Sequence, residues 1–444
     1  MHNQNLTWGQ RDSAVNWHPF TAIKTAGEAV AIVRGEGAYL YDENGKRYID
    51  AISSWWVNLH GHAHPYIAEQ VYEQLRTLEH VIFAGFTHPS AVSLSEALLA
   101  VLPENQSRVF YSDNGSTAVE VALKMSLQYA YNRGEKKTKV LAFRQGYHGD
   151  TFGAMAVSGR SGWTEPFAEL LFDVIHIDLP TAGNLAEIQA FIDQHADRIA
   201  CFIYEPLVLG AGGMLIYEAE HLDALMRHCR SKHILLVQDE IFVGFGRTGR
   251  MFAADHLTEK PDMMCLSKGL TGGTMPLGVT TCTDAVYQAF STDNVYGTLF
   301  HGHSFTANPL ACRAALASME LLKSEETQAS IARICRQHEA FRARIATHAT
   351  INTDRQCVIR QCVVRQCVVR QCVVRQCGTI LAMNLGGDGE SSYFRNQYQH
   401  VFEALLQKGI LLRPLGNVLY LVPPYCISSE DLESIYDSII EVLE

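Results

Sequence analysis

The sequence predicts an α/β protein, with a large domain built on a mostly parallel sheet and a smaller α+β domain. Three observations predict this fold. The chain has 444 residues, which is enough for one large domain with a smaller companion. From residue 107 onward, short apolar runs alternate with longer helical patterns. The apolar runs lack polar alternation, which is typical of parallel strands covered on both faces.

The first hundred residues predict strands followed by helices. Residues 28–49 alternate as strands do, and Asp42-Glu43-Asn44-Gly45-Lys46 supplies a hairpin turn. Helical periodicity then covers residues 65–80 and 90–102, and the second helix stops near Pro103.

From residue 107 the pattern predicts the units of a parallel sheet. Strands are expected at residues 108–111, 139–143, 171–177, 200–204, 233–238 and 263–266, and helices at 116–131, 218–231 and 309–323. Catalytic groups in such a fold lie at the carboxyl ends of the strands. We expect an N-terminal segment at 1–55 that packs with a small domain at 311–444, and a large domain at 56–310.

Composition excludes several classes of protein. Hydrophobic residues make up 47% and charged residues 19% of the chain, as in a globular enzyme rather than a disordered protein. The formal net charge of −11 argues against non-specific binding to nucleic acid or to an anionic membrane. No signal peptide and no apolar run of membrane-spanning length is visible, so we expect a cytoplasmic protein.

Two charged residues stand at the ends of predicted strands. The run His233-Ile234-Leu235-Leu236-Val237-Gln238 ends at Asp239, and Met263-Met264-Cys265-Leu266 ends just before Lys268. A lysine amine can form a Schiff base with an aldehyde, and a carboxylate can keep a pyridinium nitrogen protonated, so the pair suits pyridoxal phosphate. Charged residues are also common at strand ends, because strands finish at the solvent.

Two loops after predicted strands suit a flat, phosphorylated ligand. Gly115 and Ser116 open a predicted helix, where N–H groups and the helix dipole favour an anion. Tyr147, between Gly146 and Gly149, is placed to stack on a ring. The simpler interpretations are an ordinary helix N-cap and a packed surface tyrosine.

Two other motifs suggest a nicotinamide site and a metal site, but their sequence context argues against both. The run Gly244–Gly249 follows a strand and Asp-Glu, which is the wrong context for a dinucleotide fingerprint, so nicotinamide binding is rejected. His301 and His303 lack nearby carboxylates or cysteines to complete a metal site. Ser304 in that loop is better suited to contacting a phosphate. Arg413, amid apolar residues, needs either an internal salt bridge or a substrate carboxylate.

From about Trp17 to its C-terminus the chain resembles the class III pyridoxal-phosphate aminotransferases. The signature comprises Asp239-Glu240-Ile241, Gly244-Phe245-Gly246-Arg247-Thr248-Gly249, Pro261-Asp262, Ser267-Lys268-Gly269 and Gly272-Gly273. The resemblance implies a fold-type I homodimer with active sites at the subunit interface.

The resemblance also implies roles for single residues. Lys268 would form the Schiff base, Asp239 would hold the pyridine nitrogen, and Tyr147 would stack on the ring. The phosphate would be bound by Gly115 and Ser116, with help from Ser304 of the partner subunit. The implied substrate contacts are Trp55, Tyr147, Lys268, Gly302 and Arg413, the last holding a carboxylate.

Within the family, the chain looks most like the branch that works in biotin biosynthesis. The motifs include Trp17-His18-Pro19-Phe20, Ser53-Ser54-Trp55-Trp56 and Arg413-Pro414. This implies transamination of 8-amino-7-oxononanoate to 7,8-diaminononanoate, with S-adenosylmethionine as amino donor. Phe20 departs from the tyrosine usual in members that use this donor, so lysine is an alternative. His303 and Ser304 follow the general class III pattern rather than the proline-threonine form of some of those members.

Three rival functions remain. One is another class III ω-aminotransferase acting on ornithine, 4-aminobutyrate or a similar amine, although Trp55-Trp56 with Tyr147 favours a long apolar substrate. Another is an isomerase that moves an amino group within one molecule and needs no external donor. The third is a non-catalytic member, which Lys268 argues against.

A pentapeptide array covers residues 355–377, with cysteines at 357, 362, 367, 372 and 377. A period of five fits neither a strand nor a helix. The family carries a single strand here, for which Val374-Arg375-Gln376-Cys377-Gly378 suffices, so the other copies predict an inserted loop or ribbon. Five cysteines without histidine partners make a metal or redox site the less favoured interpretation.

Overall fold

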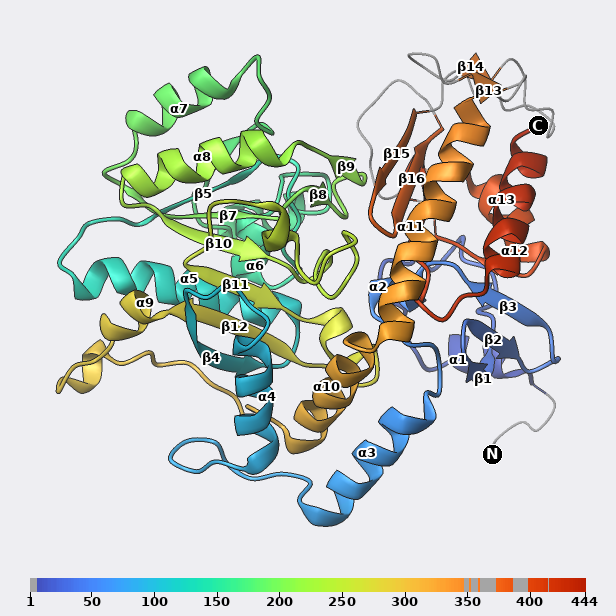
Figure 1. The fold of residues 1–444 in the computed structure, drawn as a ribbon, viewed down its shortest axis with the longest axis horizontal. Helices are drawn as coiled ribbons and strands as arrows, with labels where there is room; N and C mark the ends of the chain where they lie inside the picture. The colour runs from blue at the N-terminus through green and yellow to red at the C-terminus, as the bar shows by residue number, and fades with distance from the viewer. Residues whose placement is uncertain (1–5, 347–350, 353–357, 360–372, 386–397, 414) are drawn as a thin grey trace.

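The fold is described by a computed structural model, shown in Figure 1. It describes residues 6–346, 351–352, 358–359, 373–385, 398–413 and 415–444. Within these ranges, no helix is both long enough and apolar enough to cross a membrane.

A seven-stranded sheet forms the centre of the molecule, which confirms the predicted α/β class. The strand order is β4 (Gln106–Ser112), β12 (Gly278–Thr283), β11 (Met263–Leu266), β10 (Leu235–Asp239), β7 (Ile199–Tyr204), β5 (Lys139–Phe143) and β6 (Ile175–Ile177). Strand β12 is antiparallel to both of its neighbours, and the other six strands are mutually parallel. The carboxyl ends of those six strands therefore meet at one edge.

Of the predicted strands, those at 139–143 and 263–266 have the observed bounds, those at 108–111 and 200–204 extend by one or two residues to β4 and β7, and one strand was missed. The strand predicted at residues 171–177 is reduced to β6, and the 3-10 helix η1 (Glu165–Leu170) lies before it. Strand β10 begins two residues later than predicted and includes Asp239. Sequence reasoning did not assign β12, which packs antiparallel between two parallel strands.

Helices cover both faces of this sheet, as Figure 1 shows. The helices that contact the sheet include α4 (Pro89–Leu99), α5 (Gly115–Asn132), α6 (Phe152–Val157), α8 (Ala219–Ser231) and α9 (Asp284–Gln288). Helix α7 (Leu185–Asp193) packs on α8, and α10 (Pro309–Leu322) packs on α4 and on α3 (Pro65–Thr77). Along β5, Val140 and Ala142 pack with the core of α5, whereas Leu141 and Phe143 pack with the core of α8. Apolar residues on both faces explain why the strand has no polar alternation.

Smaller sheets lie beside the central one. The first contains β1 (Ile32–Glu36), β2 (Tyr39–Asp42), β3 (Arg47–Asp50) and β17 (Ile410–Leu411), with the predicted hairpin turn between β2 and β3. The second is antiparallel and contains β15 (Val373–Cys377), β16 (Ile380–Asn384) and β18 (Val418–Leu421). The two-stranded pairs are β8 (Val208–Leu209) with β9 (Leu215–Ile216), and β13 (Ile351–Asn352) with β14 (Val358–Ile359).

The N-terminal strands lie beside C-terminal elements, because β3 pairs in parallel with β17. Around them are α1 (Trp8–Ser13), α2 (Ser53–Trp56), α11 (Glu325–Ala346), α12 (Gln399–Gln407) and α13 (Ser429–Leu443). The remaining 3-10 helices are η2 (Ala253–His256), η3 (Lys268–Thr271) and η4 (Val295–Gly297). The division at residues 55 and 310 stays a prediction.

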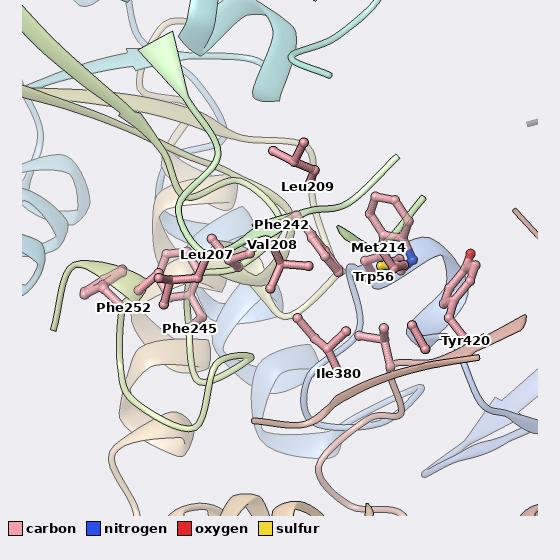
Figure 2. Close-up of a cluster of buried hydrophobic side chains, with 14 of the residues drawn as sticks. Trp56, Leu207, Val208, Leu209, Met214, Phe242, Phe245, Phe252, Ile380 and Tyr420 are labelled. Atoms are coloured by element: carbon pink, nitrogen blue, oxygen red, sulfur yellow. The ribbon is translucent and has the colours of Figure 1, made fainter. Parts of the chain in front are cut away.

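One part of the hydrophobic core joins segments that are distant in the sequence. Figure 2 shows Trp56 between Phe242 and Tyr420, with Met214 close by. The ring centroids of Trp56 and Phe242 are 4.3 Å apart, and those of Trp56 and Tyr420 are 6.0 Å apart. This packing places Trp56 where the central sheet meets the smaller sheets.

Most of the pentapeptide array lies outside the described residues. The interpretation of the extra copies as an inserted loop or ribbon falls on those residues and stays a prediction. The described parts of the array are β14, which pairs with β13, and the residues from Val373, which opens β15 and pairs with Asn384. The strand therefore begins one residue before the predicted segment Val374–Gly378 and ends at Cys377.

We expect deletion of residues 358–372, which removes fifteen residues of the array, to leave a folded enzyme. The deletion removes β14, which among the described residues pairs only with the two-residue strand β13, but it keeps all of β15 and its pairing with β16. Shortening a long connection changes its closure free energy by less than about 1 kcal/mol. Thermal unfolding and turnover of the deletion variant check this. Insoluble protein would show that the repeats belong to the core.

Candidate active site

Five loops or strand ends meet at the carboxyl edge of the central sheet. Gly115 follows β4, Tyr147 follows β5, Glu205 follows β7, Asp239 ends β10, and Lys268 follows β11. All five line one cavity of about 630 Å³. This is the edge where ligands bind in open α/β sheets, and its volume suits a cofactor or small substrate.

Lys268 begins η3 with a left-handed backbone, φ +47°. Its Nζ lies 4.9 Å from the centroid of the Trp56 ring. Burial lowers the pKa of Lys268, and the negative charges of Asp239 and Glu205 oppose that shift. A lowered pKa increases the fraction of neutral amine, the form that condenses with an aldehyde.

Asp239 is 3% exposed and is held from two sides. Its Oδ2 lies 2.7 Å from Nδ1 of His148, and its Oδ1 accepts a hydrogen bond of 3.0 Å from the Ile241 N–H. His148 is 3% exposed, and its Nε2 has no hydrogen-bond partner among the described residues. The histidine therefore orients the carboxylate toward the cavity.

Sequence reasoning missed His148 and Glu205 as site residues. The signal for His148 was its position directly after Tyr147 in a strand-end loop. Glu205 has the same signal, because it follows β7 immediately. Its carboxylate accepts hydrogen bonds of 2.9 Å from the N–H groups of Tyr147 and Gly210. Burial raises the pKa of Glu205 to about 7, His148 opposes the shift, and Asp239 adds to it.

The N-terminus of α5 opens into the same cavity. Asn114 is its N-cap and accepts from the Thr117 N–H, so Ser116 is not the cap. The Ser116 hydroxyl instead accepts a 3.3 Å hydrogen bond from the Asp150 N–H. A Cβ on Gly149, at φ +132°, would lie 2.0 Å from Ser116 Oγ, so only glycine allows this approach. The result is a close-packed helix N-terminus suited to an anion.

Trp55 and Arg413 form a second group beside this cavity. The Arg413 guanidinium carbon lies 4.5 Å from the centroid of the Trp55 ring. The ring of Phe20 meets Trp55 edge-on at a centroid distance of 5.5 Å. Trp55 adjoins Trp56, which does line the cavity. Neither Trp55 nor Arg413, both predicted substrate contacts, lines the cavity itself.

Gly302 and Ser304 are exposed and do not reach this cavity. In the same loop, Nδ1 of His301 lies 3.1 Å from Nζ of Lys124, and Nδ1 of His303 lies 3.2 Å from a carboxylate oxygen of Asp113. The two histidines thus face different partners. Over the described ranges, no three His, Cys, Asp or Glu side chains are grouped to hold a metal ion.

The fold, with Lys268 and Asp239 at the carboxyl edge of the central sheet, is that of an aminotransferase. Comparison with known families shows which class of aminotransferase it is. The family description Aminotransferase class-III matches residues 22–443, and the chain belongs to that family. This confirms the resemblance derived from the motifs.

Within this family, the chain is similar to particular enzymes and solved structures. The chain is 44% identical to the adenosylmethionine-8-amino-7-oxononanoate aminotransferase of Synechococcus elongatus, over 96% of this chain and 98% of that one. The crystal structure of the Methanocaldococcus jannaschii enzyme of that name has a TM-score of 0.88 and 34% identity, covering 97% of each chain. An amine transaminase from an uncultivated Pseudomonas species, in its PLP-bound form, has a TM-score of 0.85 and 27% identity, covering 97% of this chain and 98% of that one.

Proposed function

We propose that this enzyme uses pyridoxal phosphate to transfer an amino group to the ketone of 8-amino-7-oxononanoate, giving 7,8-diaminononanoate. The observation that carries the proposal is the convergence of Lys268, Asp239 and the N-terminus of α5 on one cavity. The 44% identity to a relative with that activity in its name supports the choice of acceptor. As part of the proposal, we place the enzyme in the cytoplasm.

The residues present fit the cofactor. The Lys268 amine, with its lowered pKa, suits the aldehyde of the cofactor. The buried Asp239 carboxylate suits the ring nitrogen, and the N-terminus of α5 beside Gly149 suits the phosphate. When bound, pyridoxal phosphate supplies an aldehyde that captures amines and a ring that accepts electrons.

Each residue then has a distinct task. The Lys268 amine would hold the cofactor through its aldehyde, and as a free amine it would move a proton to or from the reacting carbon of the substrate. Asp239 keeps a proton on the ring nitrogen, and His148 holds the aspartate in position. Gly115 and Ser116 bind the phosphate through the helix N-terminus. Tyr147, fixed through its N–H by Glu205, covers the ring face and limits the access of water.

The proposal includes a homodimer in which Gly302 and Ser304 complete the site of the other subunit. Large apolar side chains are exposed in the same loop: Phe300 and Tyr296 are each 86% exposed, and Phe305 is 60% exposed. Such a cluster on one loop is typical of a covered interface. A molecular mass near twice 49.4 kDa by light scattering is the expected result.

For the amino donor we propose S-adenosylmethionine. Phe20 packs on Trp55 at the edge of the site but carries no hydroxyl. The test is a single turnover of the loaded enzyme with S-adenosylmethionine and, separately, with lysine. Conversion by lysine alone would overturn the donor and leave the acceptor in place.

For the acceptor we expect Arg413→Ala to raise KM for 8-amino-7-oxononanoate by about ten- to a hundredfold. A lost charge-assisted contact to a carboxylate costs roughly 1.5–3 kcal/mol. The donor half-reaction should change far less, because that substrate does not present the same distant carboxylate.

Steady-state kinetics of each half-reaction check the Arg413 prediction. Arg34→Ala is the control, since Arg34 also stacks on an aromatic ring, that of Tyr41, with its guanidinium carbon 3.7 Å from the ring centroid. An unchanged KM in Arg413→Ala would remove the arginine from the substrate site.

A further inference from the structure

Four consecutive residues without glycine adopt left-handed backbone beside the active-site cavity. The φ angles of Ser53, Ser54, Trp55 and Trp56 are 51°, 44°, 72° and 75°. Left-handed conformation is unfavourable for side chains with a Cβ, and runs of it are rare. The turn therefore persists only if its surroundings hold it in place.

Asp50 holds this turn with a fully buried carboxylate. Its Oδ1 accepts from the N–H groups of Ser54 at 3.0 Å and Ile52 at 3.3 Å, and its Oδ2 accepts from the Ser54 hydroxyl at 2.7 Å. The same Oδ2 lies 2.9 Å from Nε2 of His62. Charge-assisted hydrogen bonds of this kind are the strong ones.

His62 is itself oriented for this contact. Its Nδ1 lies 3.2 Å from Nδ2 of Asn58, whose Oδ1 accepts from the Gly61 N–H at 2.7 Å. The amide nitrogen donates, so Nδ1 accepts and the Nε2 proton points at Asp50.

Buried groups from other segments hold the same turn. The Ser53 hydroxyl donates to the Val422 carbonyl at 2.7 Å, and Arg247 donates to the carbonyls of Trp56 and Asn58. Burial lowers the pKa of Arg247, whereas Tyr425 and Asp50 act in the opposite sense.

The turn directs two successive tryptophans to two different parts of the site. Trp56 packs on Phe242 (Figure 2). Its ring centroid also lies 4.9 Å from Nζ of Lys268. Trp55 lies between Phe20 and Arg413. In a right-handed turn or a strand, the angle between the two tryptophan side chains would differ. Either the Trp56 contacts or the Trp55 contacts would then be lost.

We propose that Asp50, together with His62, is a positioning residue that sets the substrate pocket by holding this left-handed turn. The inference rests on the proposed function, since it assigns the two tryptophans to the substrate. Asp50 touches neither the cofactor cavity nor Lys268 and acts through Ser54.

The first test changes Asp50 itself. In Asp50→Asn an amide donor faces the Ser54 hydroxyl and His62, and we expect KM for 8-amino-7-oxononanoate to rise about tenfold. Glycine adopts the left-handed region without strain. The double variant Asp50→Asn/Ser54→Gly should therefore recover to within about threefold of the wild type.

A second pair of variants leaves Asp50 in place. Ser54→Ala and Ser54→Gly both lose the hydroxyl, but only alanine keeps a Cβ at φ 44°. We expect a raised KM in the alanine variant and a near-normal KM in the glycine variant. This pair decides the question even if Asp50→Asn does not fold.

The matched control is Asp42→Asn in the neighbouring hairpin. Asp42 is 8% exposed and accepts three hydrogen bonds, from the N–H groups of Asn44 and Lys46 and from the Tyr48 hydroxyl. Asp42 makes no contact with the turn. The Asp42→Asn variant should therefore be less stable than the wild type but have an unchanged KM. A KM rise in Asp42→Asn equal to that in Asp50→Asn would overturn the proposal.

A readout without turnover separates this inference from the proposed function. Adding pyridoxal phosphate to the apoenzyme should quench Trp56 fluorescence, and the quenching should weaken in Asp50→Asn and return in the double variant. If the wild type does not aminate the oxononanoate, the proposed function fails while the fluorescence comparison still holds. Equal quenching in all variants would overturn the inference.

Discussion

Lys268→Ala should abolish turnover, with a loss on the order of 10⁴-fold or more, while the protein still binds pyridoxal phosphate. The loss is large because the variant lacks both the amine that attaches the cofactor and the group that moves the proton. Binding should persist because the proposed phosphate site, the N-terminus of α5, does not include the lysine. Assays of transamination and equilibrium dialysis of the cofactor measure the two effects.

Borohydride reduction distinguishes this result from general damage. After reduction and denaturation, the cofactor should stay attached to the wild type and be released from Lys268→Ala. Lys260→Ala is the control, since Lys260 donates to the carbonyls of Ala254 and Leu257 away from the cavity. Transamination by Lys268→Ala at the wild-type rate would remove the lysine from its proposed role.

Asp239→Asn should lower turnover by roughly 10²- to 10⁴-fold. An amide keeps the shape of the aspartate but cannot stabilise a protonated ring nitrogen, and breaking a buried charge pair costs about 3–5 kcal/mol. The His148 contact at 2.7 Å should also weaken. The cofactor should still attach to Lys268, so its absorbance remains while its reactivity falls.

Asp262→Asn is the matched control for Asp239→Asn. Asp262 accepts from the Leu236 N–H at 2.8 Å and binds Arg230, and it precedes β11 at the opposite edge of the same sheet. Its loss should affect stability and leave turnover per folded molecule little changed. If Asp239→Asn and Asp262→Asn lost turnover equally, Asp239 would contribute to activity only by stabilising the folded protein.

The cavity-lining residues could be predicted because the rule for parallel sheets is local. An apolar run followed by a charged or glycine-rich segment marks a carboxyl end, and this pattern alone identified Gly115, Tyr147, Asp239 and Lys268. Glu205 follows the same rule after β7 and was passed over because no family motif pointed to it. His148 was missed because a histidine in a loop gives no sign of which carboxylate it will meet.

Other features could not be read from local pattern. Strand β12 was not assigned because its six residues include three threonines and form no apolar run, and its antiparallel direction depends on its neighbours. The left-handed turn at Ser53–Trp56 contradicts the preferences of its own residues. Its partners Asp50, His62 and Val422 come from three segments, and no window of sequence contains all of them.

The sequence by itself determined the α/β class, the class III family and the lysine–aspartate pair, because strand periodicity and short motifs are encoded in neighbouring residues. Only the tertiary structure decided how the pocket is built. It paired β3 with β17, placed His148 against Asp239, and held Trp55 and Trp56 apart through a buried carboxylate. The first two contacts join residues that are far apart in the chain. The third joins Asp50 to Ser54, only four residues away, but in a backbone conformation that Ser54 itself disfavours. Packing and the pairing of buried polar groups therefore select all three.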